Sequence, residues 1–387
     1  MTPDVAVVGG GIIGTATAAF LAEAGARVTL YESTDIAAGA SGRNSGVIQQ
    51  PFDSALVGLY RRSLEEYRGL AAAVPSAFAL GAEPSGLLYV GPESAADEAA
   101  RLVAAWADAY PETAPELVPG PALRALEPGL AEGLAACRLG IGFPVAPAAA
   151  TFAFALLARQ RGARIARGGA LLRVDRDRAT GVLNGGRFEP AGAVVVAAGP
   201  WTQPVIGDGA WPPIGRSWGA VASLALEGPP RHVLEEIDID IEPDDAVEGQ
   251  ATAADTDVGF GFSLVTAAGQ SALGSTFLPD RPDQAAVLPA LRERGARYVP
   301  AIATAPLAAM RSCARPVTPD GRPLIGPVPG IAGAFVAAGH GPWGISTGPG
   351  SARLIADVVL GRTAVADVPG ALDAARFGAP QRTPVPG

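Results

Sequence analysis

The chain has 387 residues, of which 49% are hydrophobic and 17% charged, so it can bury a large core and is too long for one small domain. A formal net charge of −9 and a complete lack of lysine argue against a nucleic-acid partner and exclude Schiff-base or phosphate-binding lysines. With two cysteines and two histidines we expect no disulfide framework, no metal site and a reducing, cytoplasmic compartment.

The N-terminal 32 residues predict a strand, a turn and a helix, followed by a second strand. Val5–Val8 is a β-branched run typical of a buried parallel strand, and a glycine-rich turn (9–14) follows it. Thr15 to Ala24 then reads as a buried helix, and Arg27 to Tyr31 as the second strand. The apolar part is too short and too interrupted by glycine to span a membrane, and no basic segment precedes it as in a signal peptide.

This arrangement predicts a dinucleotide site. Gly9 permits the tight turn, Gly11 lets backbone approach a diphosphate, and Gly14 lets the helix pack on the strand. The helix N-terminus offers free N–H groups to the diphosphate, and Glu32 is placed to bind the ribose hydroxyls. The motif alone does not separate NAD from FAD. The residues assigned to the nucleotide here are Gly9, Gly11, Ile12, Ile13, Gly14, Glu32 and Ser33.

The next segment, GASGRNSG (39–46), resembles the corresponding segment of the D-amino-acid oxidase family, which includes glycine oxidase, sarcosine oxidase and D-amino-acid dehydrogenases. The resemblance implies that this stretch runs along the diphosphate and ring of FAD, with polar side chains donating hydrogen bonds. A polar surface loop is the alternative. The candidate cofactor residues are Ala40, Ser41, Arg43, Asn44, Ser45 and Gly46.

An internal segment, AVVVAAGPWT (193–202), predicts a buried strand that ends in Ala-Gly, which allows backbone contact with a ligand at the strand's carboxyl end. It resembles the strand that returns beneath the cofactor in the same family. The candidate cofactor residues in this part of the chain are Val174, Ala198, Gly199 and Trp201.

The C-terminal part carries the most specific resemblance. RPVTPDGRPLIG (315–326) is similar to the family's RPxTPDGxPxIG signature, and a predicted strand (334–337) follows it. GHGPWG (339–344) then resembles the family's GHGxxG turn, with a helix continuing to about Leu360. In the family the N–H groups of this turn face the pyrimidine end of the flavin, where a helix N-terminus stabilises negative charge. The candidate residues are Gly339, Gly341, Trp343, Gly344, Ile345 and Ser346.

The resemblance implies a role for Arg315 in binding the substrate carboxylate as a bidentate clamp, which suits the guanidinium geometry. Pairing with Asp320 is the alternative. His340 could orient the flavin turn or serve only the loop, and Trp343 could line the pocket or pack in the core. Cys313 could attach FAD covalently, as in the sarcosine-oxidase branch. We expect non-covalent FAD, because the family's aromatic two residues later is arginine here.

We expect an α/β fold, with a Rossmann-type FAD-binding domain interleaved with an α+β substrate domain built on a mixed sheet. The resemblance implies that the FAD-binding domain takes 1–50, 145–205 and 311–365 and that the substrate domain takes 51–144 and 206–310. We expect 366–387 to form a loose tail. Helices are predicted at 54–74 and 95–109, and strands at 86–90, at 220–226 and in a hairpin at 261–277. The acidic stretch 235–242 alternates with period two, which predicts a strand with Ile237, Ile239 and Ile241 inward and its acids solvated.

The resemblance implies an FAD-dependent oxidoreductase that oxidises the C–N bond of an amino acid or secondary amine by hydride transfer to the flavin. Oxygen or another acceptor would then take the electrons. A second hypothesis is 2-hydroxy-acid oxidation, because NSGVI (44–48) also resembles 2-hydroxyglutarate dehydrogenases, although those carry histidine where this chain has Gln49. A third is a non-catalytic flavin-binding assembly factor.

Overall fold

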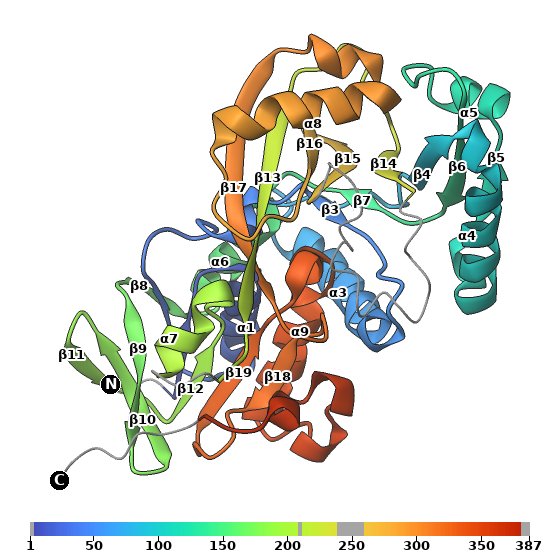
Figure 1. Ribbon diagram of the computed structural model, residues 1–387. Helices are drawn as coiled ribbons and strands as arrows, with labels where there is room; N and C mark the ends of the chain where they lie inside the picture. Colours follow the sequence, from blue (N-terminus) through green and yellow to red (C-terminus); the bar gives the residue numbers. More distant parts are fainter. Residues whose placement is uncertain (1–3, 208–210, 238–258, 381–387) are drawn as a thin grey trace.

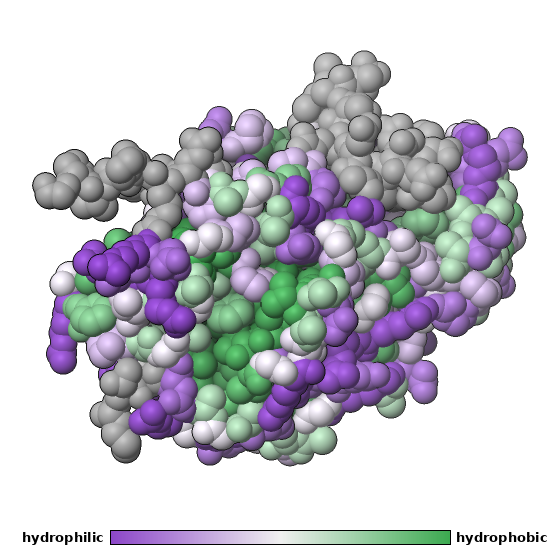
Figure 2. All heavy atoms as spheres, turned by 90° about the horizontal axis from the view of Figure 1, so that it is seen from below, coloured by the Kyte–Doolittle hydropathy of each residue, from purple (hydrophilic) through white to green (hydrophobic). Residues whose placement is uncertain are grey.

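The computed structural model describes residues 4–207, 211–237 and 259–380. It is dominated by two large sheets. In Figure 1 the six-stranded sheet is in the lower part of the view and the eight-stranded sheet in the upper part. Figure 2 views the molecule from the six-stranded end, where apolar residues gather in the middle of the face and polar residues surround them. The mixed α/β fold expected from the sequence is confirmed.

The six-stranded sheet has β1 near its centre, between β12 and β2. All neighbouring strands are parallel except β18, which runs antiparallel to β19. In spatial order the strands are β18 (Leu324–Pro327), β19 (Ala334–Ala338), β12 (Ala193–Val196), β1 (Val5–Val8), β2 (Val28–Glu32) and β8 (Arg164–Arg167). The strand order reverses beside β1, and ligands of open α/β sheets bind at the carboxyl ends of the strands at such a point.

The two faces of this sheet are covered differently. Val5 and Val7 of β1 point into a core shared with four helices, whereas Ala6 and Val8 point into a second core on the other face. The helices are α1 (Ile12–Glu23), α3 (Ser54–Ala73), α6 (Ala149–Gln160) and α9 (Gly344–Val359). The other face carries a three-stranded sheet of β9 (Ala170–Asp175), β10 (Arg178–Asn184) and β11 (Arg187–Pro190), with α7 (Thr202–Ile206) beside it. This alternation follows from the period-two side-chain geometry of strands.

The eight-stranded sheet also has two distinct faces. Leu88 and Val90 pack under α8 (Gln284–Tyr298), while Leu87 and Tyr89 face the other way. Its strands, in spatial order, are β17 (Leu307–Val317), β13 (Gly215–Leu224), β16 (Gln270–Thr276), β15 (Phe260–Ala267), β14 (Val233–Glu236), β4 (Leu87–Pro92), β6 (Leu134–Leu139) and β5 (Glu116–Val118). The helices α4 (Ala96–Ala109) and α5 (Gly120–Leu126) lie at the β5 end (Figure 1).

The two bodies meet through a short segment of the N-terminal part. It contains α2 (Ala40–Arg43) and β3 (Val47–Ile48), and β3 pairs with β7 (Phe143–Pro144). Arg311 of β17 donates to Asn44 O at 3.1 and 3.2 Å, and Arg43 donates to Ser312 O at 3.1 Å. The face of the eight-stranded sheet away from α8 is therefore directed towards the glycine-rich turns.

Most sequence predictions of elements agree with the structure. The helices expected at 54–74 and 95–109 are α3 and α4, and the hairpin turns at Ala268 and Gly269, both with positive φ. The domain boundary expected at 311 falls inside β17, so the division into two domains stays a prediction.

Two expectations need correction. In the acidic stretch the strand β14 ends at Glu236, Glu235 is only partly exposed and bonded to Gln49, and residues 238–242 lie outside the described ranges. The prediction of a loose tail is wrong for the part up to residue 377. Leu372 and Ala374 are buried, and the Arg376 guanidinium donates to Asp320 Oδ2 at 2.8 Å. This stretch forms three short 3₁₀ turns, namely η7 (Val365–Asp367), η8 (Gly370–Leu372) and η9 (Ala374–Phe377), of which η8 and η9 lie against β18.

Candidate active site

The first glycine turn requires its glycines. Gly9 has a φ of +116°, and a Cβ there would collide with Ala197 O, while a Cβ on Gly14 would collide with Gly9 O. Gly11 is the N-cap residue of α1, and a Cβ on it would approach Ser41 Oγ to 3.1 Å. The turn is thus pressed between β1, β12 and the start of α1, and it directs the helix N-terminus to the carboxyl edge of the sheet.

Polar groups surround this helix N-terminus. The Ile12 N–H donates to Ser41 Oγ at 2.9 Å, and the Gly10 N–H donates to Glu32 Oε2 at 2.7 Å. Glu32 Oε1 also accepts from Thr34 N at 2.7 Å and from Ser33 Oγ at 3.2 Å. The positive end of the helix dipole together with an acid at the end of β2 fits the diphosphate and ribose of a dinucleotide.

The segment after β2 is shaped by its own side chains. Asn44 donates from Nδ2 to Ala40 O at 3.1 Å and to Ser41 O at 2.8 Å, and its Oδ1 accepts from Gly46 N at 2.8 Å. Its amide therefore holds the loop conformation. Arg43 is exposed.

The internal segment ends at the same carboxyl edge. Ala198 and Gly199 follow β12 next to Gly9, and Gly199 has a φ of +56°. Trp201 is 45% exposed and lies against Gly39, where a Cβ would be 3.3 Å from its ring. Val174 of β9 packs against the core on this side of the sheet.

The second glycine turn leads directly into α9. Gly339 and Gly341 have φ values of +85° and +51°, and α9 begins at Gly344 without a side chain capping it. Ser346 Oγ in its first turn accepts from Gln49 N at 3.1 Å. The first turn of α9 therefore offers backbone N–H groups and a positive dipole end, which suit an acceptor on a bound flavin.

The side chain of His340 serves the helix. It is 1% exposed, and its Nε2 lies 2.9 Å from Ser351 Oγ, which itself donates to Thr347 O at 3.0 Å. Nε2 is therefore the donor nitrogen. Burial lowers the pKa of His340 to about 3, so the imidazole is neutral. Trp343 is partly buried and packs against the helical core.

Arg315 is held without an acidic partner among the described residues. Its Nη1 donates to Thr276 O at 2.6 Å, its Nη2 donates to Ser275 Oγ at 3.0 Å, and its Cζ lies 4.4 Å from the Phe277 ring centroid. Burial lowers the pKa of Arg315 to about 10. Asp320, the partner considered from the sequence, pairs instead with Arg376. A guanidinium that is desolvated and unpaired favours an anionic ligand.

Cys313 lies between Arg311 and Arg315 on β17. It is buried, and burial raises the pKa of its thiol although Arg43 and Arg315 oppose the rise. A cavity of about 120 Å³ lies beside Arg311, lined also by Ser45, Ser223 and Gln270. Arg311 donates from Nε and Nη2 to Asn44 O and from Nη1 to Ser223 Oγ.

One polar pair was not predicted from the sequence. Gln49 donates from Nε2 to the Glu235 carboxylate at 3.1 and 3.3 Å, and burial raises the pKa of Glu235 to about 7. We expected solvated carboxylates in the acidic stretch, but Glu235 lies two residues from Ile237 and therefore shares its inward face. The available signal for the other member of the pair was Gln49, which stands where the 2-hydroxyglutarate dehydrogenases carry histidine.

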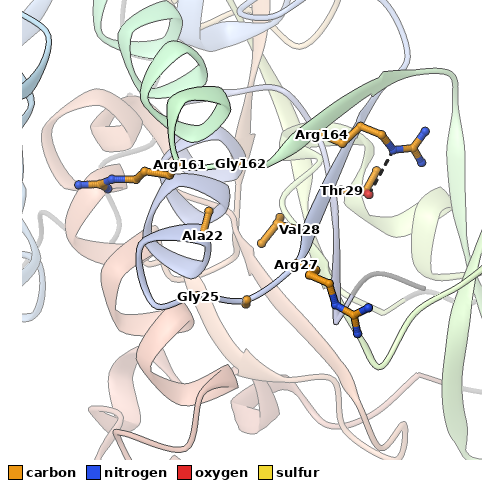
Figure 3. A pocket seen from close by; sticks show the side chains of 9 residues that line it. Ala22, Gly25, Arg27, Val28, Thr29, Arg161, Gly162 and Arg164 are labelled. Atoms are coloured by element: carbon orange, nitrogen blue, oxygen red, sulfur yellow. Dashed lines mark hydrogen bonds between the residues drawn. The ribbon is translucent and has the colours of Figure 1, made fainter. Parts of the chain in front are cut away.

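A depression of about 370 Å³ lies elsewhere, at the amino ends of β2 and β8 (Figure 3). Three arginines line it, but each is engaged: Arg27 with Asp4, Arg161 with Glu23 and Arg164 with Glu189. It is on the opposite edge of the sheet from the glycine turns, so we do not assign the chemistry to it. Within the described ranges there is no cluster of three metal-ligating side chains and no helix long and apolar enough to cross a membrane.

Comparison with known proteins places this geometry in a family. The family model "DAO: FAD dependent oxidoreductase" matches residues 4–358. The chain belongs to this family. Glycine oxidase of Geobacillus kaustophilus is 32% identical over 372 residues, covering 92% of each chain. FAD is therefore the cofactor, and the activity is oxidation of amino acids or amines.

Solved structures agree. Glycine oxidase from Geobacillus kaustophilus has a TM-score of 0.78 at 27% identity, covering 99% of both chains. Iminodiacetate oxidase from Chelativorans sp. BNC1 has a TM-score of 0.77 at 23% identity, covering 97% of this chain and 98% of that one, which shows the shared fold. The glycine turns and the free N-terminus of α9 fit FAD as the family implies.

Proposed function

We propose that this FAD-dependent enzyme oxidises the C–N bond of a small amino acid whose carboxylate is bound by Arg315. The observation that carries the proposal is the half-buried guanidinium of Arg315, which has only neutral partners among the described residues. A bidentate carboxylate would give it the anion that its surroundings lack. The glycine oxidase relatives support an amino-acid substrate.

The roles of the remaining residues follow from their positions. When bound, FAD accepts the hydride from the carbon next to the substrate nitrogen. The start of α1 with Gly9, Gly11 and Glu32 would hold its adenosine diphosphate end, and the first turn of α9 would face its ring. Cys313 lies beside the site as a protonated thiol, and we propose that the cofactor is bound without a covalent link.

The two alternative hypotheses are not favoured. Oxidation of a 2-hydroxy acid is less well supported, because the relatives named above are amino-acid and amine oxidases and Gln49 replaces the histidine of the hydroxy-acid enzymes. A flavin-binding assembly factor would have no use for an unpaired guanidinium near the cofactor. Transfer of electrons to oxygen and a cytoplasmic location are further parts of the proposal.

Anaerobic mixing of the purified holoenzyme with candidate amino acids, amines and 2-hydroxy acids tests the function. We expect amino acids to bleach the flavin absorbance, and peroxide formed on admitting air would identify oxygen as an acceptor. Bleaching by hydroxy acids alone would contradict the proposal.

Substitution of Arg315 tests whether this residue binds the substrate carboxylate. Arg315→Ala should raise KM for an amino acid by about 30-fold or more, since truncating one partner of a buried charge pair costs about 2–5 kcal/mol. Arg315→Lys should recover only part of the affinity, because ammonium does not make the bidentate pair. Arg216, exposed on the neighbouring strand β13, provides the matched control as Arg216→Ala. An unchanged KM in Arg315→Ala would remove the clamp assignment.

A further inference from the structure

Glu235 and Arg315 lie on one face of the eight-stranded sheet, and the guanidinium of Arg315 reaches β16, two strands from Glu235. Glu235 pairs in register with Ser263 of β15, and Ser263 pairs with Gly274 of β16. Arg315 reaches the same part of β16, because its guanidinium donates to Ser275 Oγ. Neighbouring strands are about 4.8 Å apart and successive residues of a strand about 3.3 Å apart, so the backbone at Glu235 is about 10 Å from Gly274 and about 10–12 Å from the β16 backbone at Ser275 and Thr276, where the guanidinium is bonded.

Both groups are on the sheet face that is directed towards the glycine turns. A Cβ on Gly274 would lie 3.5 Å from Ser45 Oγ and 3.9 Å from Val221, so this part of β16 faces the segment after β2. At one end Glu235 bonds to Gln49, which follows β3. The next residue, Glu236, points to the α8 side, where it bonds to Arg294 and Tyr298.

Gln49 adds a second acceptor beside the Glu235 carboxylate. Gln49 is 3% exposed, its N–H is bonded to Ser346 Oγ and its Nε2 to Glu235. Its Oε1 is buried and has no hydrogen-bond partner among the described residues. A buried acceptor without a donor costs about 1–3 kcal/mol, so this pair is arranged to accept hydrogen bonds from a group that arrives.

We propose that Glu235 and Gln49 form the amine-binding site of the substrate, with Glu235 and Gln49 Oε1 each accepting a hydrogen bond from the substrate ammonium. The proposal rests on the proposed function, in which Arg315 binds the carboxylate of the same molecule. The Glu235 side chain extends into this gap, and an α-amino acid with hydrogen bonds of about 2.9 Å at both ends can bridge the rest. The site then selects an amine over a hydroxyl, because a hydroxy acid brings no positive charge to the carboxylate.

The same contact can move the proton that amine oxidation must remove. The ammonium N–H bond breaks, an O–H bond forms on Glu235, and the nitrogen keeps the electron pair that it needs when the adjacent carbon loses hydride. Burial raises the pKa of Glu235 to about 7, which brings its proton affinity closer to that of an amine.

The titratable groups near Glu235 do not change charge over the same pH range. Tyr89 is its register partner on β4, and burial holds the pKa of Tyr89 well above 10. Cys137 on β6 pairs with Tyr89, and burial raises the pKa of Cys137 to about 12. Gln49 does not ionise, so Glu235 is the group expected to change charge near neutral pH.

Two inert ligands separate the ends of the site. 2-Aminoisobutyrate carries an ammonium and a carboxylate but has no hydrogen on its α-carbon to give up, and pivalate carries the carboxylate alone. Their dissociation constants are measured on the holoenzyme by calorimetry and by the change in flavin absorbance. In Glu235→Gln we expect 2-aminoisobutyrate to bind about tenfold more weakly, as for loss of one charged hydrogen bond, and pivalate to bind as in the wild type. Wild-type affinity for 2-aminoisobutyrate should rise with pH through about 7, and this dependence should vanish in the variant.

The controls distinguish the possible failures. Glu236→Gln, the neighbouring carboxylate on the other face of β14, should leave both affinities unchanged, and Arg315→Ala should weaken both ligands. Equal weakening of the two ligands by Glu235→Gln, or no weakening at all, would overturn the amine site while leaving the carboxylate clamp in place. If Arg315→Ala changes neither affinity, the proposed function fails as well.

Discussion

The guanidinium of Arg315 occupies space that a side chain on Gly219 would fill. A Cβ built on Gly219 would lie 2.7 Å from Nη2 and 2.8 Å from Cζ of Arg315, across the β13–β17 pairing. The absence of a side chain at 219 thus lets the guanidinium lie flat on the sheet and reach Thr276 O and Ser275 Oγ. The position of the candidate clamp depends on a glycine that belongs to neither glycine-rich turn.

Gly219→Ala is expected to impair substrate binding more than folding. The new methyl group meets the end of a flexible side chain and no backbone, so Arg315 moves and the sheet stays. A displacement of about 1 Å in a positioning group can cost up to about 100-fold, and we expect kcat/KM for an amino acid to fall about 10- to 100-fold. Steady-state kinetics and thermal melting on the same samples measure the two effects.

A matched glycine on the same sheet is the control for that prediction. Gly261 of β15 has open space where a Cβ would stand, so Gly261→Ala should leave kcat/KM within about twofold of wild type. A large drop in melting temperature for Gly219→Ala, with unchanged kinetics in the folded fraction, would show that Gly219 matters for packing and not for Arg315.

The flavin is expected to leave the protein on denaturation. Because Cys313 is buried and burial raises its pKa, the thiolate that would form a covalent link is disfavoured. Acid precipitation of the wild type should release the flavin to the supernatant, and Cys313→Ser should keep the same flavin content. Flavin that stays in the wild-type pellet but is released from Cys313→Ser would show a covalent link.

The sequence predicted those parts of the site that depend on local chain geometry. Gly9 and Gly14 are needed because backbone lies against them, and this requirement leaves a recognisable spacing in one short segment. Arg315 was identified in the same way, through a motif of adjacent residues. The partners of Arg315 lie about 40 positions away on another strand, and no pattern in the sequence indicates them.

Glu235 shows the limit of periodicity more sharply. Alternation along 235–242 predicted a strand with Ile237 inward, and Glu235 shares that face, but only the structure reveals that its carboxylate is bonded there by Gln49. The prediction for the C-terminal stretch was wrong for a related reason. Its composition is typical of a loose tail, whereas Arg376 is fixed by a long-range ion pair with Asp320.

Arg376→Ala should destabilise the protein through that ion pair. The guanidinium also donates to Pro323 O at 3.0 Å and Arg322 O at 2.6 Å, so its removal leaves several acceptors and one carboxylate without their donor. We expect a loss of about 2–4 kcal/mol in the free energy of unfolding, measured by urea titration. Arg362→Ala, at an exposed pair 4.0 Å from Asp357, should cost less than about 1 kcal/mol. Equal losses in the two variants would mean that residues 365–377 add little to stability.

The stability of the substrate-free protein should depend on pH through the ionisation of Glu235. Its folded pKa of about 7 is above the usual value of 4.5, so between these values the folded protein holds a proton that the unfolded chain has released. Stability from this group therefore falls as pH rises from 4.5 to 7 and stays constant above that. Glu235→Gln removes the effect, so the stability of the variant relative to wild type should rise by about 3 kcal/mol between pH 4.5 and pH 8.

Urea unfolding of both proteins across this range measures the difference, in which the opposite contribution of His340 cancels because both proteins contain it. Glu236→Gln should instead be less stable than wild type by about 1–2 kcal/mol at pH 8, because it weakens the hydrogen bonds to Arg294 and Tyr298. A stability difference between Glu235→Gln and wild type that does not change with pH would mean that the Glu235 carboxyl titrates normally. The unfavourable buried charge that an incoming ammonium is proposed to neutralise would then be absent.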